Sequence, residues 1–273
     1  MFFSNTIRLF WWNEKIIQGK KRENYGDLLG KYLVEKISSK KVVFAWPKKF
    51  SFLDYITPIY VTVGSILANV NHKCIVWGSG IIDQNTKIKN AVFLAVRGPQ
   101  TRKFLLNLSY EVPEIYGDPA LLLPRYFNPK INKKYKYGFV PHYNDYKVVQ
   151  NWFKDNPDVL LIDLMTNDIE AKTIELLQCK KIVSSSLHGV IVAHAYNIPA
   201  VWQKFSDKVF GDDIKYQDYF ESVQLPFVQP EIRLDKYSNA ELEMLFEELP
   251  NLPKREIIDQ LCDGLLNVCP FKK

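Results

Sequence analysis

The chain has 273 residues and a formal net charge of +6, and 47% of its residues are apolar, which is enough for one large domain or two domains of about 120–150 residues. It contains no run of about 18 uncharged apolar residues and no signal-peptide pattern, so we expect neither a membrane span nor export. The positive charge fits an anionic substrate or a membrane surface, and although it also permits nucleic acid, the sequence has no nucleic-acid-binding motif.

Four cysteines (Cys74, Cys179, Cys262 and Cys269) are spread along the chain without a CxxC pair. This spacing favours a reducing, cytoplasmic location and predicts neither a disulfide framework nor a zinc site. We find no other cluster of metal-ligating residue types, so we expect no metal ion.

Residues 7–12 are predicted to form the first strand, and the amphipathic run from Leu28 to Ile37 a helix. Asn24 and Asp27 flank Gly26 just before that helix. Asp27 either caps the helix or belongs to a binding site, and the pattern does not separate the two interpretations. Gly26 lets the backbone turn tightly and approach a ligand.

The next strands are predicted at 41–44, 60–65, 74–80 and 91–96. Two of them end in Gly-Ser, the later one at Gly78 and Ser79, and open α/β sheets bind ligands at such strand ends. The motif is not GxGxxG, so no dinucleotide site is predicted. Strand 91–96 ends on Arg97, which needs an anionic partner if buried. That partner is either a structural carboxylate or the carboxylate or phosphate of a substrate.

A further strand at 112–116 and an apolar run at 120–124 enclose Asp118, for which a turn role is at least as plausible as binding. Residues 125–136 are rich in lysine and contain a proline, and we predict that they link a domain of residues 1–124 to a domain of residues 125–273. The linker lysines fit a solvated face or an anionic membrane surface.

The second half repeats the alternation of strands and helices. Strands are predicted at 137–141, 159–163, 181–183 and 199–203, and helices at 148–154, 169–177, 187–196, 239–248 and 254–268. We therefore predict an α/β protein with two doubly wound, Rossmann-like parallel-sheet domains that face each other across a cleft. The C-terminal helices complete the second domain or pack back on the first.

Three serines, Ser184–Ser186, precede helix 187–196, and a helix start of this kind attracts anions. His188 falls in the first turn of that helix, and His142 follows strand 137–141. Because carboxyl ends of parallel strands meet at one edge, we expect Arg97, His142 and His188 to contribute to a ligand site there. His194 points roughly 120° away from His188, so we interpret it as a core histidine.

The sequence resembles the polysaccharide pyruvyl transferase family, in particular its bacterial exopolysaccharide branch. The resemblance runs from about residue 10 to 222 and is carried by FWWNEKIIQGKKRENYGDLLG, IVWGSGII, VRGPQTRKFL, YGDPALLLP, GFVPHYND and SSSLHGVIVAHAYNIPAVW. It implies a fold like that of the two-domain GT-B glycosyltransferases. It also implies transfer of an enolpyruvyl unit from phosphoenolpyruvate (PEP) to a sugar, which gives a pyruvate ketal on two hydroxyls.

The resemblance ties Arg97 of the RGP motif and His188 of the SLHG motif to PEP recognition and catalysis. Donor binding then extends to the residues around His188: Ser185, Ser186, Leu187 and Gly189. We expect His188, or else His142, to protonate the PEP methylene carbon, because this step needs an acid with a pKa of about 7. Some relatives have an arginine where this chain has Ser186, so we expect a second cation from Arg102, Arg125, Lys204 or Lys215.

The weaker candidates for binding the acceptor are Asn24, Gly26, Asp27, Gly78, Ser79 and Asp118. The expected acceptor is a hexose of a surface polysaccharide or of its polyprenyl-diphosphate-linked precursor, which would place the enzyme in the cytoplasm at the inner membrane face. The chemistry needs no cofactor and no metal. One alternative is a GT-B glycosyltransferase with a nucleotide-sugar donor. Another is a carbohydrate-binding module that uses the abundant tyrosines and tryptophans, which would leave the strand-end arginine and histidines without a purpose.

Overall fold

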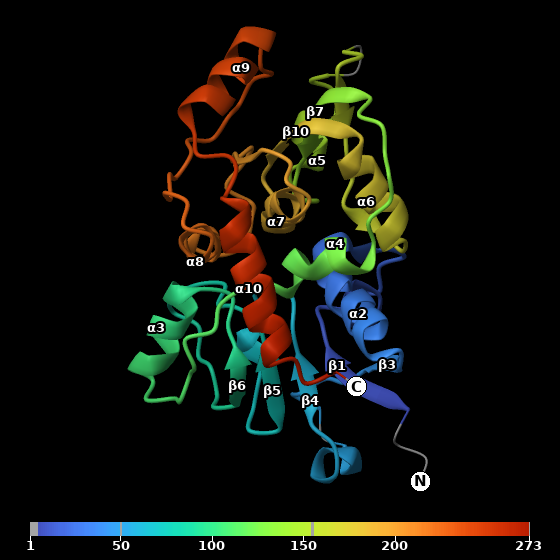
Figure 1. Cartoon of the computed structure of the whole chain (residues 1–273), viewed down its shortest axis with the longest axis vertical. Helices are drawn as coiled ribbons and strands as arrows, with labels where there is room; N and C mark the ends of the chain where they lie inside the picture. Colours follow the sequence, from blue (N-terminus) through green and yellow to red (C-terminus); the bar gives the residue numbers. More distant parts are fainter. Residues whose placement is uncertain (1–4, 50, 154–155, 273) are drawn as a thin grey trace.

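A computed structural model describes residues 5–49, 51–153 and 156–272 as a mixed α/β structure with two parallel sheets (Figure 1). The five-stranded sheet has the order β3-β1-β4-β5-β6, and all its strands are parallel. Its strands are β1 (Thr6–Phe10), β3 (Lys41–Phe44), β4 (Ile59–Val61), β5 (Cys74–Trp77) and β6 (Val92–Ala95). The chain reverses its direction of travel across this sheet between β1 and β4, which creates a crevice at their carboxyl ends.

The second sheet has the same kind of topology. Its order is β11-β10-β7-β8, again parallel throughout, so the reversal lies between β7 and β10. Its strands are β7 (Tyr135–Val140), β8 (Val159–Leu161), β10 (Cys179–Ser184) and β11 (Ala200–Trp202). A short antiparallel pair of β2 (Glu23–Asn24) and β9 (Met165–Thr166) joins the two halves.

The helices connect and cover these strands. They are α1 (Glu14–Gln18), α2 (Tyr25–Ser38), α3 (Pro99–Asn107), α4 (Leu123–Tyr126), α5 (Tyr146–Val149), α6 (Ile169–Leu177), α7 (Leu187–Ala195), α8 (Ile214–Ser222), α9 (Asn239–Glu248) and α10 (Arg255–Asn267), with 3-10 turns η1 (Phe52–Tyr55), η2 (Leu67–Asn69) and η3 (Pro119–Leu122). Within the described residues, no helix is both long and apolar enough to cross a bilayer.

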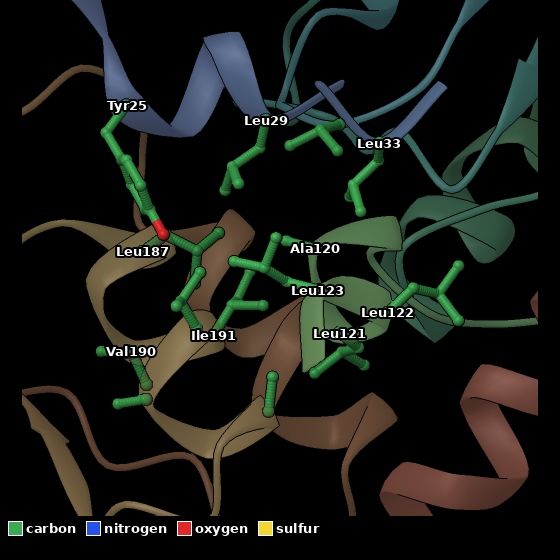
Figure 2. Close-up of a cluster of buried hydrophobic side chains, with 14 of the residues drawn as sticks. Tyr25, Leu29, Leu33, Ala120, Leu121, Leu122, Leu123, Leu187, Val190 and Ile191 are labelled. Carbon is green, nitrogen blue, oxygen red and sulfur yellow. The ribbon is translucent and has the colours of Figure 1, made fainter. Parts of the chain in front are cut away.

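One hydrophobic core runs through both halves (Figure 2). It brings the apolar face of α2 together with η3, α4 and α7 through Tyr25, Leu29, Leu33, Ala120, Leu121, Leu122, Leu123, Leu187, Val190 and Ile191. Complete burial of one such leucine or valine contributes about 1.5–3 kcal/mol. Because the starts of α2 and α7 both carry candidate site residues, this core fixes their relative position.

The last helix, α10, reaches back to the first sheet, and the C-terminus lies near β1 and β3 (Figure 1). The indole of Trp77 donates a hydrogen bond to the Leu265 carbonyl at 2.9 Å. Phe271 then packs edge-on against Tyr60 and Trp77, with ring centroids 4.8 and 5.6 Å apart. Packing of the C-terminal segment on the N-terminal sheet was one of the two predicted arrangements, and the division at residues 124 and 125 itself stays a prediction.

Most predicted elements are present, with four differences. The predicted strand at 112–116 is wrong, because only Tyr116 makes a single parallel bridge, to Val96, and Pro113 has no N–H to donate. Helix α5 is shorter than predicted, and the predicted end at Lys154 lies outside the described residues. Strand β7 begins inside the predicted linker, and helix α8 was not predicted at all.

Candidate active site

A pocket of about 480 Å³ lies where the switch points of the two sheets face each other. Trp12 and Ser65 enter it from the segments that follow β1 and β4, and His142 and His188 from those that follow β7 and β10. Open parallel sheets bind ligands at the carboxyl ends of their strands. The pocket is therefore the candidate site that the topology itself selects.

His188 is held in the pocket wall by neighbours on two sides. Its side chain is 12% exposed, and its Nε2 atom lies 3.6 Å from the Oδ2 atom of the fully buried Asp118. Neither atom has another hydrogen-bond partner within the described residues. Gly26 lies against the other side of the ring, where an added Cβ would be 2.1 Å from Nδ1. Nε2 thus faces the carboxylate of Asp118, and Nδ1 faces the start of α2 at Gly26.

Asp118 is placed by its own turn. It caps η3, and its Oδ1 atom accepts a 2.9 Å hydrogen bond from the Ala120 amide. This bond leaves Oδ2 for His188. The turn role considered from sequence is confirmed, and Asp118 orients a pocket residue without lining the pocket itself.

His142 also lines the pocket, from the segment that follows β7, the strand that pairs with β10. Burial lowers its pKa to about 3, with smaller contributions from the charges of Lys215 and Lys20. Its amide donates a 2.9 Å hydrogen bond to Ser185, whose hydroxyl in turn bonds the buried Asp145. At neutral pH this imidazole is uncharged, so it does not offer a charged ring that could act as the acid.

The serine turn presents the start of α7 to the pocket. Ser184 has a structural role, because its hydroxyl contacts the carbonyls of Val140 and Ser186 and accepts a hydrogen bond from the Ser186 amide. Ser186 is the N-cap residue and lines the pocket with Leu187, yet α7 has no side-chain cap. The first amides of a helix lack intrahelical partners and favour an anion. Ser185 and Gly189 are not among the described pocket-lining residues.

Lys215 supplies a cation to the same pocket from α8. It is 9% exposed, and its Nζ atom donates a 2.7 Å hydrogen bond to the Phe210 carbonyl. Burial, followed by the positive charge of Arg97, lowers its pKa to about 8. Of the four possible second cations named from sequence, Lys215 is the one that lines the pocket; Arg102, Arg125 and Lys204 instead pair with Glu114, Asp263 and Asp213.

Arg97 lies behind the pocket wall. It is fully buried, and its guanidinium bonds Asp218 at 2.9 Å, the Ser65 hydroxyl at 2.6 Å and the Ile81 carbonyl at 2.8 Å. The structural ion pair considered from sequence is thus present. Because Ser65 lines the pocket, Arg97 reaches the site through that hydroxyl.

The start of α2 brings two further polar residues to the pocket. Asn24 caps the helix by accepting from the amides of Gly26 and Asp27, so of the two interpretations left open for Asp27, capping is wrong. Asp27 lines the pocket one turn later. Desolvation by the surrounding protein raises its pKa to about 7, although the nearby His188 lowers it.

Glu14, at the start of α1, lines the pocket although only 1% of it is exposed. Its Oε2 atom lies 2.9 Å from Lys20, whose Nζ is 4.3 Å from the centre of the Tyr143 ring. Glu14, Trp12 and Tyr143 were not identified as site residues from the sequence, because a short run of apolar and charged residues does not indicate that it lines a pocket.

Of the six predicted acceptor residues, Asn24 and Asp27 line the pocket, whereas Gly26, Gly78, Ser79 and Asp118 do not. Gly78 has a φ of +87°, and a Cβ there would lie 2.4 Å from Pro119, so close packing explains this glycine. Ser79 is fully buried and donates to the Gly64 carbonyl at 2.7 Å. The placement of these two residues gives them a role in the turn, and it does not support acceptor binding.

His194 is a core histidine, as interpreted from sequence. Its Nδ1 atom accepts from the Tyr219 hydroxyl at 2.9 Å, and its Nε2 faces the carbonyls of Ala200 and Asn251. Burial lowers its pKa to about 4. In the part of the chain that the structure describes, no three His, Cys, Asp or Glu side chains are grouped so that they could hold a metal ion.

Comparison with known proteins adds a family to this geometry. The family model described as "Polysaccharide pyruvyl transferase" matches residues 11–202. An uncharacterized protein of Acanthamoeba polyphaga mimivirus is 35% identical over 203 residues, which cover 72% of this chain and 69% of that protein. The succinoglycan biosynthesis protein ExoV of Rhizobium meliloti is 25% identical over 171 residues, which cover 60% of this chain and about half (51%) of ExoV.

Proposed function

The chain belongs to the polysaccharide pyruvyl transferase family, and from this premise we propose that it transfers an enolpyruvyl group from PEP to a hexose of a surface polysaccharide or of its lipid-linked precursor. The similarity to ExoV, a succinoglycan biosynthesis protein, supports the exopolysaccharide branch of the family. The product is a pyruvate ketal that bridges two sugar hydroxyls, and the by-product is inorganic phosphate.

The observation that carries the proposal is the combination of groups in one pocket. Two histidines, a buried lysine and the uncapped start of α7 line the same cavity. Lys215 and the start of α7 suit a small trianionic donor, because anions are stabilised by helix starts and by partly desolvated cations, and the histidines can take part in proton transfer. A nucleotide-sugar donor has no comparable need for a proton donor beside its phosphates.

We assign the donor to the wall formed by α7 and α8. The PEP phosphate would accept from the first amides of α7 beside Ser186, and Lys215 would pair with the phosphate or the carboxylate. Arg97 would act through Ser65, which it holds in place at 2.6 Å. The proposed role of Arg97 in donor binding is therefore to position a hydroxyl and to add positive potential from behind the wall.

Chemistry would begin with proton transfer from His188 to the methylene carbon of PEP. This step leaves positive charge on the adjacent carbon, to which a sugar hydroxyl adds while its proton passes to His142. The carbon–oxygen bond to phosphate then breaks, and a neighbouring hydroxyl closes the ketal and releases its proton to the departing phosphate. Asp118, 3.6 Å from Nε2, would orient His188 for the first transfer, and the uncharged ring of His142 would take the hydroxyl proton as the new bond to carbon forms.

The family resemblance also supports a proposal for the arrangement of the two sheets and for where the enzyme works. We propose a GT-B-like arrangement in which the pocket is the floor of the cleft between the two sheets. With a polyprenyl-linked acceptor, the enzyme would work at the cytoplasmic face of the membrane, and the lysines of residues 125–136 would rest on anionic lipid.

The test is a thermal-shift experiment with PEP, UDP-galactose and UDP-glucose on wild type, Lys215→Gln and Lys204→Gln. A ligand at about 100 times its Kd stabilises the folded state by about 2.7 kcal/mol. We expect a shift with PEP for wild type and Lys204→Gln, and a smaller shift or none for Lys215→Gln. Lys204 is a matched control because it is a neighbouring lysine that pairs with Asp213 at 2.6 Å and does not line the pocket.

Stabilisation of the wild type by a nucleotide sugar and not by PEP would refute the proposed donor and favour a glycosyltransferase. Equal PEP shifts in all three proteins would keep the donor and remove Lys215 from its binding site.

A further inference from the structure

Glu14, a buried acidic residue of the pocket, has no role in the proposed chemistry. Glu14 is 1% exposed and lines the cavity, and neither of its carboxylate oxygens accepts a hydrogen bond within the described residues. Lys20 faces one oxygen at 2.9 Å, and the other oxygen has no such partner. Burial of a carboxylate costs several kcal/mol unless hydrogen bonds compensate for the lost water. An unsatisfied buried carboxylate in a pocket wall therefore points to a ligand that donates hydrogen bonds.

The surroundings of Glu14 differ from the donor wall. Burial raises the pKa values of Asp27 and Tyr143, and the charge of Glu14 adds a smaller increase to each. The three residues therefore lie within electrostatic reach of one another. Trp12, two residues before Glu14 in the chain, also lines the pocket. The residues around Glu14 thus combine negative charge with aromatic rings, whereas Lys215 and the start of α7 bring positive charge to the pocket.

A trianionic donor would be repelled from the side of Glu14. A carboxylate accepts hydrogen bonds only, so it is satisfied by O–H or N–H donors. Aromatic rings bind flat apolar surfaces, and Trp and Tyr also offer polar edges. A neutral pyranose meets both requirements, since it presents hydroxyl donors around its rim and C–H groups on its face.

We propose that Glu14 and Trp12 form the acceptor subsite, where Glu14 accepts hydrogen bonds from hydroxyls of a neutral hexopyranose and Trp12 supports its apolar face. The inference rests on the proposed function only in naming this sugar the acceptor. Lys20 pairs with Glu14 at 2.9 Å, and the Lys20 ammonium lies 4.3 Å from the centre of the Tyr143 ring. Asp27 and Asn24 extend the same wall toward His188.

The experiment measures binding of methyl β-galactopyranoside, methyl β-glucopyranoside and methyl α-mannopyranoside by saturation-transfer NMR, with and without PEP. The variants are Glu14→Gln, which keeps the shape and removes the charge, and Glu23→Gln as the matched control. Glu23 is a buried carboxylate beside Glu14 whose Oε2 accepts from the Glu14 amide at 2.7 Å, but it does not line the pocket. A PEP thermal shift is recorded for each protein.

We expect at least one hexoside to bind wild type and Glu23→Gln equally well, and Glu14→Gln to bind it about tenfold more weakly, which corresponds to about 1.4 kcal/mol. The PEP shift should be the same in all three proteins. Equal hexoside affinity in Glu14→Gln, or no hexoside binding to wild type in either condition, would overturn the subsite, and Glu14 would then be only the structural partner of Lys20. Glu14-dependent hexoside binding without any PEP shift would keep the subsite and refute the proposed donor.

Discussion

Gly26 offers the sharpest test of whether the position of His188 controls the reaction. The residue lies in the first turn of α2, and its φ is not positive, so the backbone itself would accept alanine. The obstacle is space, because a Cβ would lie 2.1 Å from Nδ1, 2.6 Å from Cγ and 3.0 Å from Cβ of His188. Non-bonded atoms need about 3.5 Å, so in Gly26→Ala the ring must retreat by more than about 1 Å.

A displacement of about 1 Å at a reacting group costs on the order of 10²-fold in rate. We therefore expect Gly26→Ala to lower kcat for phosphate release from PEP by about 10²-fold, assayed with a panel of methyl and p-nitrophenyl hexosides as acceptors. Stability should change much less, because overpacking costs about 1–3 kcal/mol while alanine in a helix returns up to about 1 kcal/mol.

Gly264→Ala is the matched control. It makes the same change in helix α10, where the nearest atom to the new Cβ is Ile115 Cγ2 at an ordinary 3.7 Å. This variant should keep wild-type kcat and a Tm equal to or above that of the wild type. A Gly26→Ala enzyme with near wild-type kcat would refute the reasoning, since it would show that the chemistry tolerates a displaced His188.

Two further predictions concern charges around the pocket. Asp27 has a pKa raised from 3.8 to about 7, so the folded state holds its proton more tightly, and the wild type loses stability as the pH rises through that interval. Relative to wild type, Asp27→Asn should gain up to about 4 kcal/mol of unfolding free energy between pH 4 and pH 8 in urea titrations, and parallel pH profiles would exclude Asp27 as the titrating group. Asp218→Ala should lower the unfolding free energy by about 3–5 kcal/mol, because it leaves the charge of Arg97 buried without its partner. The double variant Arg97→Met with Asp218→Leu should regain much of that stability; if it then still shows the full PEP shift, Arg97 is a structural residue only.

The alternation of strands and helices was readable from the sequence because it depends on local patterns. Strand β3, helix α6 and helix α9 have the bounds that their apolar periodicity predicts. His142 and His188 were also identified as site residues, since His142 comes shortly after β7, His188 lies in the first turn of the helix after β10, and strand ends of parallel sheets meet at one edge. The same rule predicted Arg97, but exposure is not a local property, and the structure buries it against Asp218 from a helix 121 residues away in the chain.

Helix α8 shows what local patterns miss. Seven of its nine residues are buried, including Lys215 and Asp218, so its sequence lacks the polar face that marks an ordinary surface helix. Its place against α3 and the pocket decides that Lys215, among four candidate cations, becomes the pocket lysine.

The sequence alone determined the fold class, the family and the strand ends from which the site is built, because these follow from periodicity and contiguous motifs. Only the tertiary structure decided the pairings that give the site its chemistry, such as His188 with Asp118 and Gly26, and Glu14 with Lys20. The reason is physical: burial, charge and hydrogen bonding depend on which segments meet in space. The shared core of α2, η3 and α7 sets that arrangement.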